Sequence, residues 1–289
     1  MGGVGPGPAA AVTPAGRTGG LLIPPDLEAS IVLLRHGESV FITEGRFQGQ
    51  ADSPLSPLGE RQAALAAARL AAPTRSPAFP VADRAPLEIV HSPLLRAART
   101  AALAADAIAV ARGSRPAVRA EAGFAEIGQG SWEGRHRLDI EANDAETLAA
   151  WRREPLTANA PGGERVLDAA VRARSALTTV IGNLATVADA RSIDRGTRTI
   201  VAGYPGAAAP EAPWSLLVGH DGIFKVVLLT LLDLPLERFW TFPFALCGLS
   251  VVELRGGRTI LRAHNLTEHL AALSAGAVGS QPPGTTGGL

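Results

Sequence analysis

The sequence predicts an α/β fold, a three-layer sandwich in which a largely parallel sheet is flanked by helices. Short apolar segments alternate along the chain with longer segments in which apolar residues recur every three or four positions, as on one face of a helix. The apolar segments lack the polar–apolar alternation of a strand with one wet face. Both faces of the sheet are therefore expected to be covered by helices.

The first two strand–helix pairs lie in the first half of the chain. SIVLLR (30–35) predicts a buried strand, and residues 56–72 predict a helix with Ser56 as N-cap and Pro57 in the first position. PLEIVHS (86–92) predicts the second strand. The following segment, residues 92–111, predicts the second helix, with the pair Ser92–Pro93 as its N-cap and first residue.

The second half adds a long helix, a third strand–helix pair and a hairpin. Apolar residues at helical spacing predict a helix over 163–188. WSLLVGH (214–220) predicts the third buried strand, and residues 221–234 predict the helix behind it. Residues 248–265 predict a closing hairpin that turns at a Gly–Gly pair, 256–257.

One domain is expected between two tails. Residues 1–28 and 274–289 are rich in Gly, Pro and Ala, so we expect both to be disordered, with the domain spanning 29–273. Residues 188–213 fit no element well and are expected to form a surface insertion, with a short strand over 197–204.

The composition argues against several classes of protein. The 27 basic residues are balanced by 27 acidic ones, so no basic surplus indicates a nucleic-acid or anionic-membrane partner. Cys247 is the only cysteine, which excludes an intramolecular disulfide and a thiolate metal cluster. No apolar segment approaches the ~18 residues of a membrane span, and MGGVGPGPAAAVTPAG does not resemble a signal peptide. A cytoplasmic protein is therefore expected.

Polar side chains follow the three expected strands, as Arg35–His36, His91–Ser92 and His220–Asp221. Ligands of open α/β sheets bind beyond the carboxyl ends of the strands, so these residues are expected at one edge. Arg96 falls near the start of the second helix, where a cation is unfavourable unless an anion binds there. Because a guanidinium group can donate two parallel hydrogen bonds to phosphate oxygens, a phosphate pocket is the better interpretation.

A histidine among arginines should stay neutral and nucleophilic. A reaction at phosphorus then needs a proton donor for the leaving oxygen. GFAEIGQGSWEG offers Glu126, which glycines and Trp132 surround in a partly apolar loop that could raise its pKa. Glu38 and Glu133 are competing candidates.

Four ordered motifs resemble those of the histidine phosphatase superfamily, with its phosphoglycerate-mutase-like fold. They are RHGES (35–39), SPLLRAARTA (92–101), FAEIGQGSWEG (124–134) and LVGHDG (217–222). GRFQGQADSPLSPLGERQA (45–63) is similar to the family's segment between the first strand and the first helix, and the resemblance spans roughly residues 30–270.

The resemblance implies a role for each residue. His36 would be the nucleophile that becomes a phosphohistidine, and Glu126 the acid that protonates the departing oxygen and later helps to activate water. Arg35, Arg96 and His220 would hold the phosphoryl group. Further pocket residues would be Arg46, Gln48, Gly49 and Asp221. Such sites need neither a metal nor a cofactor, and the partner would be a small phosphorylated substrate.

Some positions depart from the family pattern. Ile42 stands where an asparagine commonly helps to hold phosphate, and Ile127, Gln129 and Arg137 replace residues typical of mutases. Trp151-Arg152-Arg153 is similar to the basic pair that mutases use for a second phosphate, but the longer mutase insert after it is missing. A phosphomonoesterase of a small metabolite is therefore favoured over a 2,3-bisphosphoglycerate-dependent phosphoglycerate mutase.

Other interpretations stay open at this point. A non-catalytic phospho-ligand-binding protein is disfavoured because the catalytic histidines and arginines are all present. A metallohydrolase using His36, His91 and His220 lacks a short-range ligand pair. His264 and His269 are interpreted as structural or surface residues, and a homodimer is neither required nor excluded.

Overall fold

The computed structural model describes residues 22–192 and 211–274. These residues form a six-stranded sheet in the order β3-β2-β4-β1-β5-β6. The strands are β1 (Glu28–Arg35), β2 (Glu88–His91), β3 (Ala117–Ala120), β4 (Trp214–Gly219), β5 (Leu249–Arg255) and β6 (Arg258–Leu266). Neighbouring strands from β3 to β1 run parallel, and β5 and β6 are antiparallel. The predicted largely parallel sheet and closing hairpin are confirmed.

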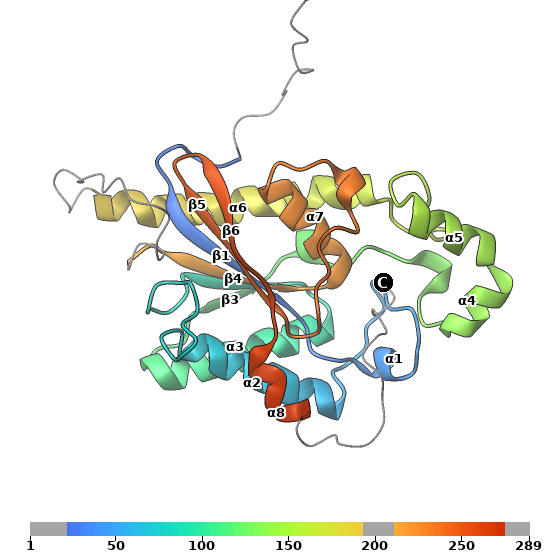
Figure 1. Cartoon of the computed structure of the whole chain (residues 1–289), viewed down its shortest axis with the longest axis horizontal. Helices are drawn as coiled ribbons and strands as arrows, with labels where there is room; N and C mark the ends of the chain where they lie inside the picture. Colours follow the sequence, from blue (N-terminus) through green and yellow to red (C-terminus); the bar gives the residue numbers. More distant parts are fainter. Residues whose placement is uncertain (1–21, 193–210, 275–289) are drawn as a thin grey trace, which may run out of the picture.

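Helices cover both faces of the sheet (Figure 1). They are α1 (Val40–Thr43), α2 (Pro57–Ala71), α3 (Leu95–Arg112), α4 (Arg137–Asn143), α5 (Ala145–Arg153), α6 (Val166–Ser192), α7 (Asp221–Leu231) and α8 (Ala271–Ser274). Short 3-10 helices lie at Ala122–Phe124, Gly130–Trp132, Leu236–Arg238 and Glu268–Leu270. The helices α6 and α7 lie on one side of the sheet and α2 and α3 on the other, while α4 and α5 extend beyond one end of it (Figure 1).

Each face of the sheet has its own apolar core. Side chains alternate along a strand, so Ile31 and Leu33 of β1 join the core under α6 and α7, whereas Val32 and Leu34 join the core under α2 and α3. All four are fully buried. This explains the unbroken apolar sequence of the strand and confirms the predicted three-layer sandwich.

The domain begins earlier than residue 29. Glu28 already belongs to β1, and Ile23 and Leu27 are buried in the core, so the predicted N-terminal tail is too long. The predicted insertion also starts too early, because α6 continues to Ser192. The rest of that segment, including the expected strand over 197–204, and the C-terminal tail from residue 275 lie outside the described residues.

The second helix begins later than predicted. It starts at Leu95, and its N-cap residue is Leu94, so Ser92 and Pro93 are not its N-cap and first residue. The exposed N–H of Leu95 instead donates to Asp52 Oδ1 at 2.9 Å. Asp52 precedes Leu95 by 43 positions in the sequence. The helix α2, in contrast, has the predicted N-cap Ser56 and a proline in its first turn.

None of the helices in the described ranges is long and apolar enough to cross a membrane.

Candidate active site

Two histidines follow neighbouring parallel strands. Arg35 at the end of β1 lies opposite Gly219 at the end of β4, so His36 and His220 leave the sheet side by side. Their ring centroids are 5.0 Å apart, and both side chains are buried. Both imidazoles can therefore reach one phosphoryl group, as the sequence predicts.

The hydrogen bond of His36 defines which ring nitrogen is free. Its Nδ1 lies 2.6 Å from the carbonyl oxygen of Gly37, which can only accept, so we assign the proton to Nδ1. Burial, followed by the charges of Arg96 and Arg35, lowers the pKa of His36 well below its usual value. The ring is thus neutral near pH 7, and its Nε2 carries the lone pair of a nucleophile.

Gly37 lets the turn after His36 pack closely on α2. A Cβ atom at this position would lie 2.4 Å from the carbonyl oxygen of Gly59, a backbone atom that cannot move aside. The N–H of Gly37 donates to Thr100 Oγ1 on α3 at 3.3 Å. The helices α2 and α3, which cover the same face of the sheet, thus fix the backbone next to His36.

His220 is held by a residue whose role the sequence did not reveal. Its Nε2 lies 2.7 Å from Ser92 Oγ, at the end of β2 next to β4. Burial, followed by the charge of Arg96, lowers the pKa of His220 well below its usual value. Ser92 therefore orients the second histidine instead of capping α3. Its position directly after a strand and its place at the start of the motif SPLLRAARTA were the signals in the sequence.

Two buried arginines complete the anion site. Arg96 Nη1 and Nη2 donate to the carbonyl oxygens of Ala51 and Gly49 at 2.9 and 2.8 Å, and Arg35 Nη1 donates to that of Phe244. Burial lowers the pKa of Arg96 to about 10, so it is still a cation at neutral pH. The Nε atoms of both Arg35 and Arg96 are buried without a hydrogen-bond partner within the described part of the chain. Two desolvated cations with unpaired donors favour a bound oxyanion.

Glu126 lies beside the second histidine. Its Oε1 accepts from the N–H of Ile223 at 2.9 Å and its Oε2 from that of Gly222 at 3.1 Å, at the start of α7 directly after His220. Burial, and to a lesser degree the charge of Asp221, raises the pKa of Glu126, although the backbone donors oppose this shift. A buried carboxyl with a raised pKa suits a proton donor.

The competing carboxylates hold loops together. Glu133 Oε1 accepts from the backbone N–H groups of Gln50 and Gln129 at 2.9 and 2.8 Å. Glu38 Oε1 accepts from Ser56 Oγ at 2.6 Å, at the N-terminus of α2. Both therefore have structural partners that explain their presence, and Glu126 is the better candidate for the acid.

The other predicted pocket residues differ in their placement. Gln48 is buried and accepts from Ser39 Oγ, and the carbonyl of Gly49 holds Arg96. Asp221 binds Lys225 Nζ at 2.6 Å and the N–H of Phe244 at 3.2 Å, so its carboxylate is occupied by the protein.

Arg46 has partners of its own in the protein. Its guanidinium group is partly exposed and binds Glu44 and the carbonyl oxygen of Gly134. Nothing in the described residues connects Arg46 to the two imidazoles. Within the same residues there is also no cluster of three or more His, Cys, Asp or Glu side chains that could hold a metal ion.

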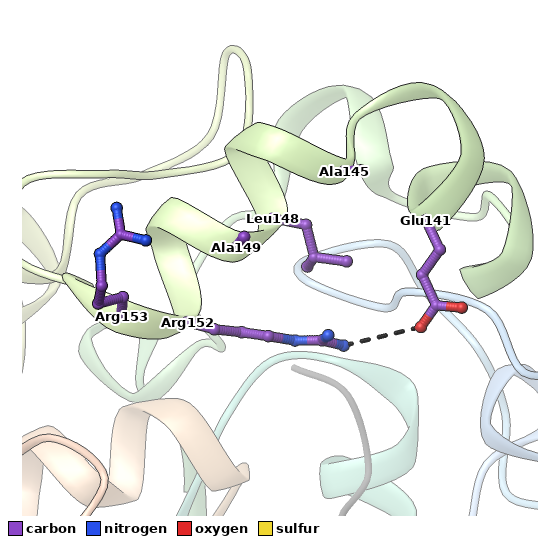
Figure 2. Close-up of a pocket in the computed structure, with 6 residues that line it drawn as sticks. All are labelled: Glu141, Ala145, Leu148, Ala149, Arg152 and Arg153. Atoms are coloured by element: carbon purple, nitrogen blue, oxygen red, sulfur yellow. Dashed lines mark ion pairs between the residues drawn. The ribbon is translucent and has the colours of Figure 1, made fainter.

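The helices α4 and α5 border an open pocket of about 540 Å³. Figure 2 shows Arg152 extending toward Glu141, whereas Arg153 points away from it. Arg152 Nη2 lies 3.9 Å from Glu141 Oε1, and Arg153 Nε lies 3.0 Å from Glu154 Oε1. The two arginines that resemble the basic pair of mutases thus have separate carboxylate partners and do not converge on one anion.

Comparisons with known proteins agree with this geometry. Residues 31–188 and 190–267 match the model of the histidine phosphatase superfamily (branch 1). A glucosyl-3-phosphoglycerate phosphatase of Mycobacterium tuberculosis is 31% identical over 211 residues, which cover 72% of this chain and 78% of the relative. A probable phosphoglycerate mutase of Yersinia enterocolitica is 27% identical, over 77% of this chain and 84% of its own.

A solved structure extends the likeness to the fold. The structure of a mycobacterial glucosyl-3-phosphoglycerate phosphatase with VO3 has a TM-score of 0.59 and 26% identity, covering 82% of this chain and 98% of its own. The matched region includes the segments of all five catalytic candidates, His36, Arg35, Arg96, Glu126 and His220. The chain therefore belongs to branch 1 of the histidine phosphatase superfamily.

Proposed function

We propose that the protein hydrolyses a small phosphorylated metabolite through a phosphohistidine formed on His36. Membership of the family, together with phosphatase relatives at 31% identity, makes it a phosphoric monoester hydrolase. The observation that carries the covalent route is the 5.0 Å separation of two buried imidazoles at the ends of neighbouring strands. Arg35 and Arg96 lie close enough to lower the pKa of both rings.

The reaction has two steps. In the first, Nε2 of His36 attacks phosphorus, the phosphorus–oxygen bond of the ester breaks, and Glu126 gives its proton to the leaving alkoxide oxygen. In the second, water attacks the phosphohistidine, Glu126 takes back a proton, the phosphorus–nitrogen bond breaks, and orthophosphate leaves. Arg35, Arg96 and His220 stabilise the charge on the phosphoryl oxygens in both steps.

A phosphate-release assay tests this function. The protein is expected to hydrolyse p-nitrophenyl phosphate at an unchanged rate after treatment with EDTA, because every group in the proposed mechanism is a side chain. A panel of phosphorylated metabolites, with glucosyl-3-phosphoglycerate first because a relative carries that name, should then identify the substrate class. Activity that is lost in EDTA and restored by a divalent metal contradicts the mechanism. Isomerisation of 3-phosphoglycerate that depends on 2,3-bisphosphoglycerate would assign the protein to the mutases.

The pH dependence should differ between two kinds of substrate. With an alkyl phosphate, kcat/KM is expected to fall at low pH as His36 becomes protonated, and to fall again as the pH rises through the raised pKa of Glu126. Nitrophenolate leaves without needing a proton, so the alkaline decrease should be much weaker with p-nitrophenyl phosphate. Each substrate's own phosphate ionisation is titrated separately and divided out of its profile. Identical alkaline limbs would argue against an acid in the first step.

A further inference from the structure

An ion pair between Arg172 and Glu164 holds the backbone of the loop that carries Glu126. Arg172, in the second turn of α6, donates from Nη1 to the carbonyl oxygens of Gly123 and Ala125 at 3.0 and 2.7 Å. Its Nη2 donates to the carbonyl oxygen of Glu126 itself at 3.0 Å. With a longer bond to the carbonyl oxygen of Ala122 at 3.4 Å, one guanidinium group thus binds four carbonyl groups, the last of them that of the residue proposed to be the acid.

Glu164 fixes the plane of that guanidinium group. Its Oε1 and Oε2 lie 2.6 and 2.7 Å from Nε and Nη2 of Arg172, which is a two-point pair. Glu164 Oε2 also accepts from the N–H of Gly128 at 3.2 Å. The pair therefore binds the loop on both sides of Glu126. Both side chains are about four-fifths buried, with exposures of 23% and 19%, so solvent competes weakly for these hydrogen bonds.

The carboxyl group of Glu126 is held from a different element. Its oxygens accept from the first turn of α7, beside His220, whereas its backbone is held from α6. Gly123 shows how tightly the loop lies on α6, since a Cβ atom there would be 2.7 Å from the carbonyl oxygen of Arg172. Movement of the loop relative to α6 would therefore displace the acid from the histidines. Proton transfer needs hydrogen-bond contact with the leaving oxygen, and a displacement of about 1 Å can cost a factor of 10² in rate.

We infer that Arg172 and Glu164 form a positioning pair that places Glu126 for protonation of the leaving group. This inference rests on the proposed function. The pair makes no hydrogen bond to either histidine among the described residues. The charge of Arg172 contributes to the lowered pKa of His220, an effect that Arg172→Lys keeps and that should bear on both substrates alike. The effect of the pair through Glu126 should depend on how much the leaving group needs a proton, which a merely structural role would not produce.

The test compares two substrates in three variants. Arg172→Met removes all the donors, and Arg172→Lys keeps the charge but not the planar group that reaches several acceptors. We expect kcat/KM for β-glycerol phosphate to fall about 10- to 100-fold in Arg172→Met and less in Arg172→Lys. For p-nitrophenyl phosphate it should change less than about threefold, because that substrate bypasses the acid. Glu164→Gln should shift the ratio of the two kcat/KM values in the same direction. This variant provides the test of the pair if Arg172→Met does not fold.

Arg165→Met is the matched control. Arg165 lies just before α6 and pairs with Asp168 at 2.7 Å, but both side chains are more than half exposed. This variant loses an arginine ion pair near the same helix and should leave both rates unchanged.

Two results would overturn the inference: equal losses on both substrates, or unchanged rates on both. Failure of the proposed function itself is distinguishable, because it appears in the unsubstituted protein as p-nitrophenyl phosphate hydrolysis that is absent or independent of His36.

Discussion

Replacing His36 with alanine is expected to lower kcat for every phosphate ester by about 10⁴-fold or more. The imidazole is proposed to form the covalent bond to phosphorus, and no neighbouring group of the site can replace it. The Nε2 atom of His220 is already engaged by Ser92 Oγ at 2.7 Å. The loss should therefore be similar for p-nitrophenyl phosphate and for alkyl esters, because both react through the same nitrogen.

The covalent intermediate itself can be measured. Mass spectrometry of the acid-labile phosphoenzyme after rapid mixing should locate a phosphoryl group on residue 36 and find none in His36→Ala. His91→Asn is the matched control, because His91 also ends a strand but binds the carbonyl oxygen of its neighbour Ser92. We expect that variant to retain most of its activity. Rapid turnover by His36→Ala, or a requirement for His91 together with added metal, would falsify the nucleophile assignment.

The fold was predictable where local pattern and tertiary burial agree. The strands β1 and β4 are unbroken apolar segments because both of their faces are buried, and the pattern predicts them directly. Strand β3, AVRA, was not predicted because it lies at the edge of the sheet and three of its four residues are exposed. The start of α3 was misassigned for a related reason. Its first N–H is satisfied by Asp52, a distant residue that no local capping pattern can reveal.

The candidate catalytic residues were predictable because each stands in a short motif, but the contacts that orient them were not. The bond from Ser92 to His220 depends on β2 lying next to β4, which is a property of the strand order. Arg172 follows Glu126 by 46 positions, and only the packing of α6 on the acid loop brings them together. Motifs thus indicated the candidate reactive groups, whereas the geometry was needed to find what orients them.

Replacing Glu126 with glutamine should separate substrates by their leaving groups. We expect kcat/KM for alkyl phosphates to fall about 10²- to 10⁴-fold, because the alkoxide would leave without a proton. For p-nitrophenyl phosphate, kcat/KM should fall less than about tenfold, since it reports the steps up to release of a stable phenolate. Its kcat should fall further, because water attack on the phosphohistidine also uses Glu126. Stopped-flow measurements should then show a burst of nitrophenolate followed by slow turnover.

Glu133→Gln is the matched control for that experiment. Glu133 lies on the same loop, but its Oε1 only accepts from two backbone N–H groups, and an amide oxygen can do the same. Both substrates should therefore react at nearly unchanged rates in this variant. A burst in Glu126→Gln with normal kinetics in Glu133→Gln would assign proton transfer to one carboxyl group. Equal losses on both substrates in Glu126→Gln would mean that its buried carboxyl group supports the start of α7 and does not protonate the leaving oxygen.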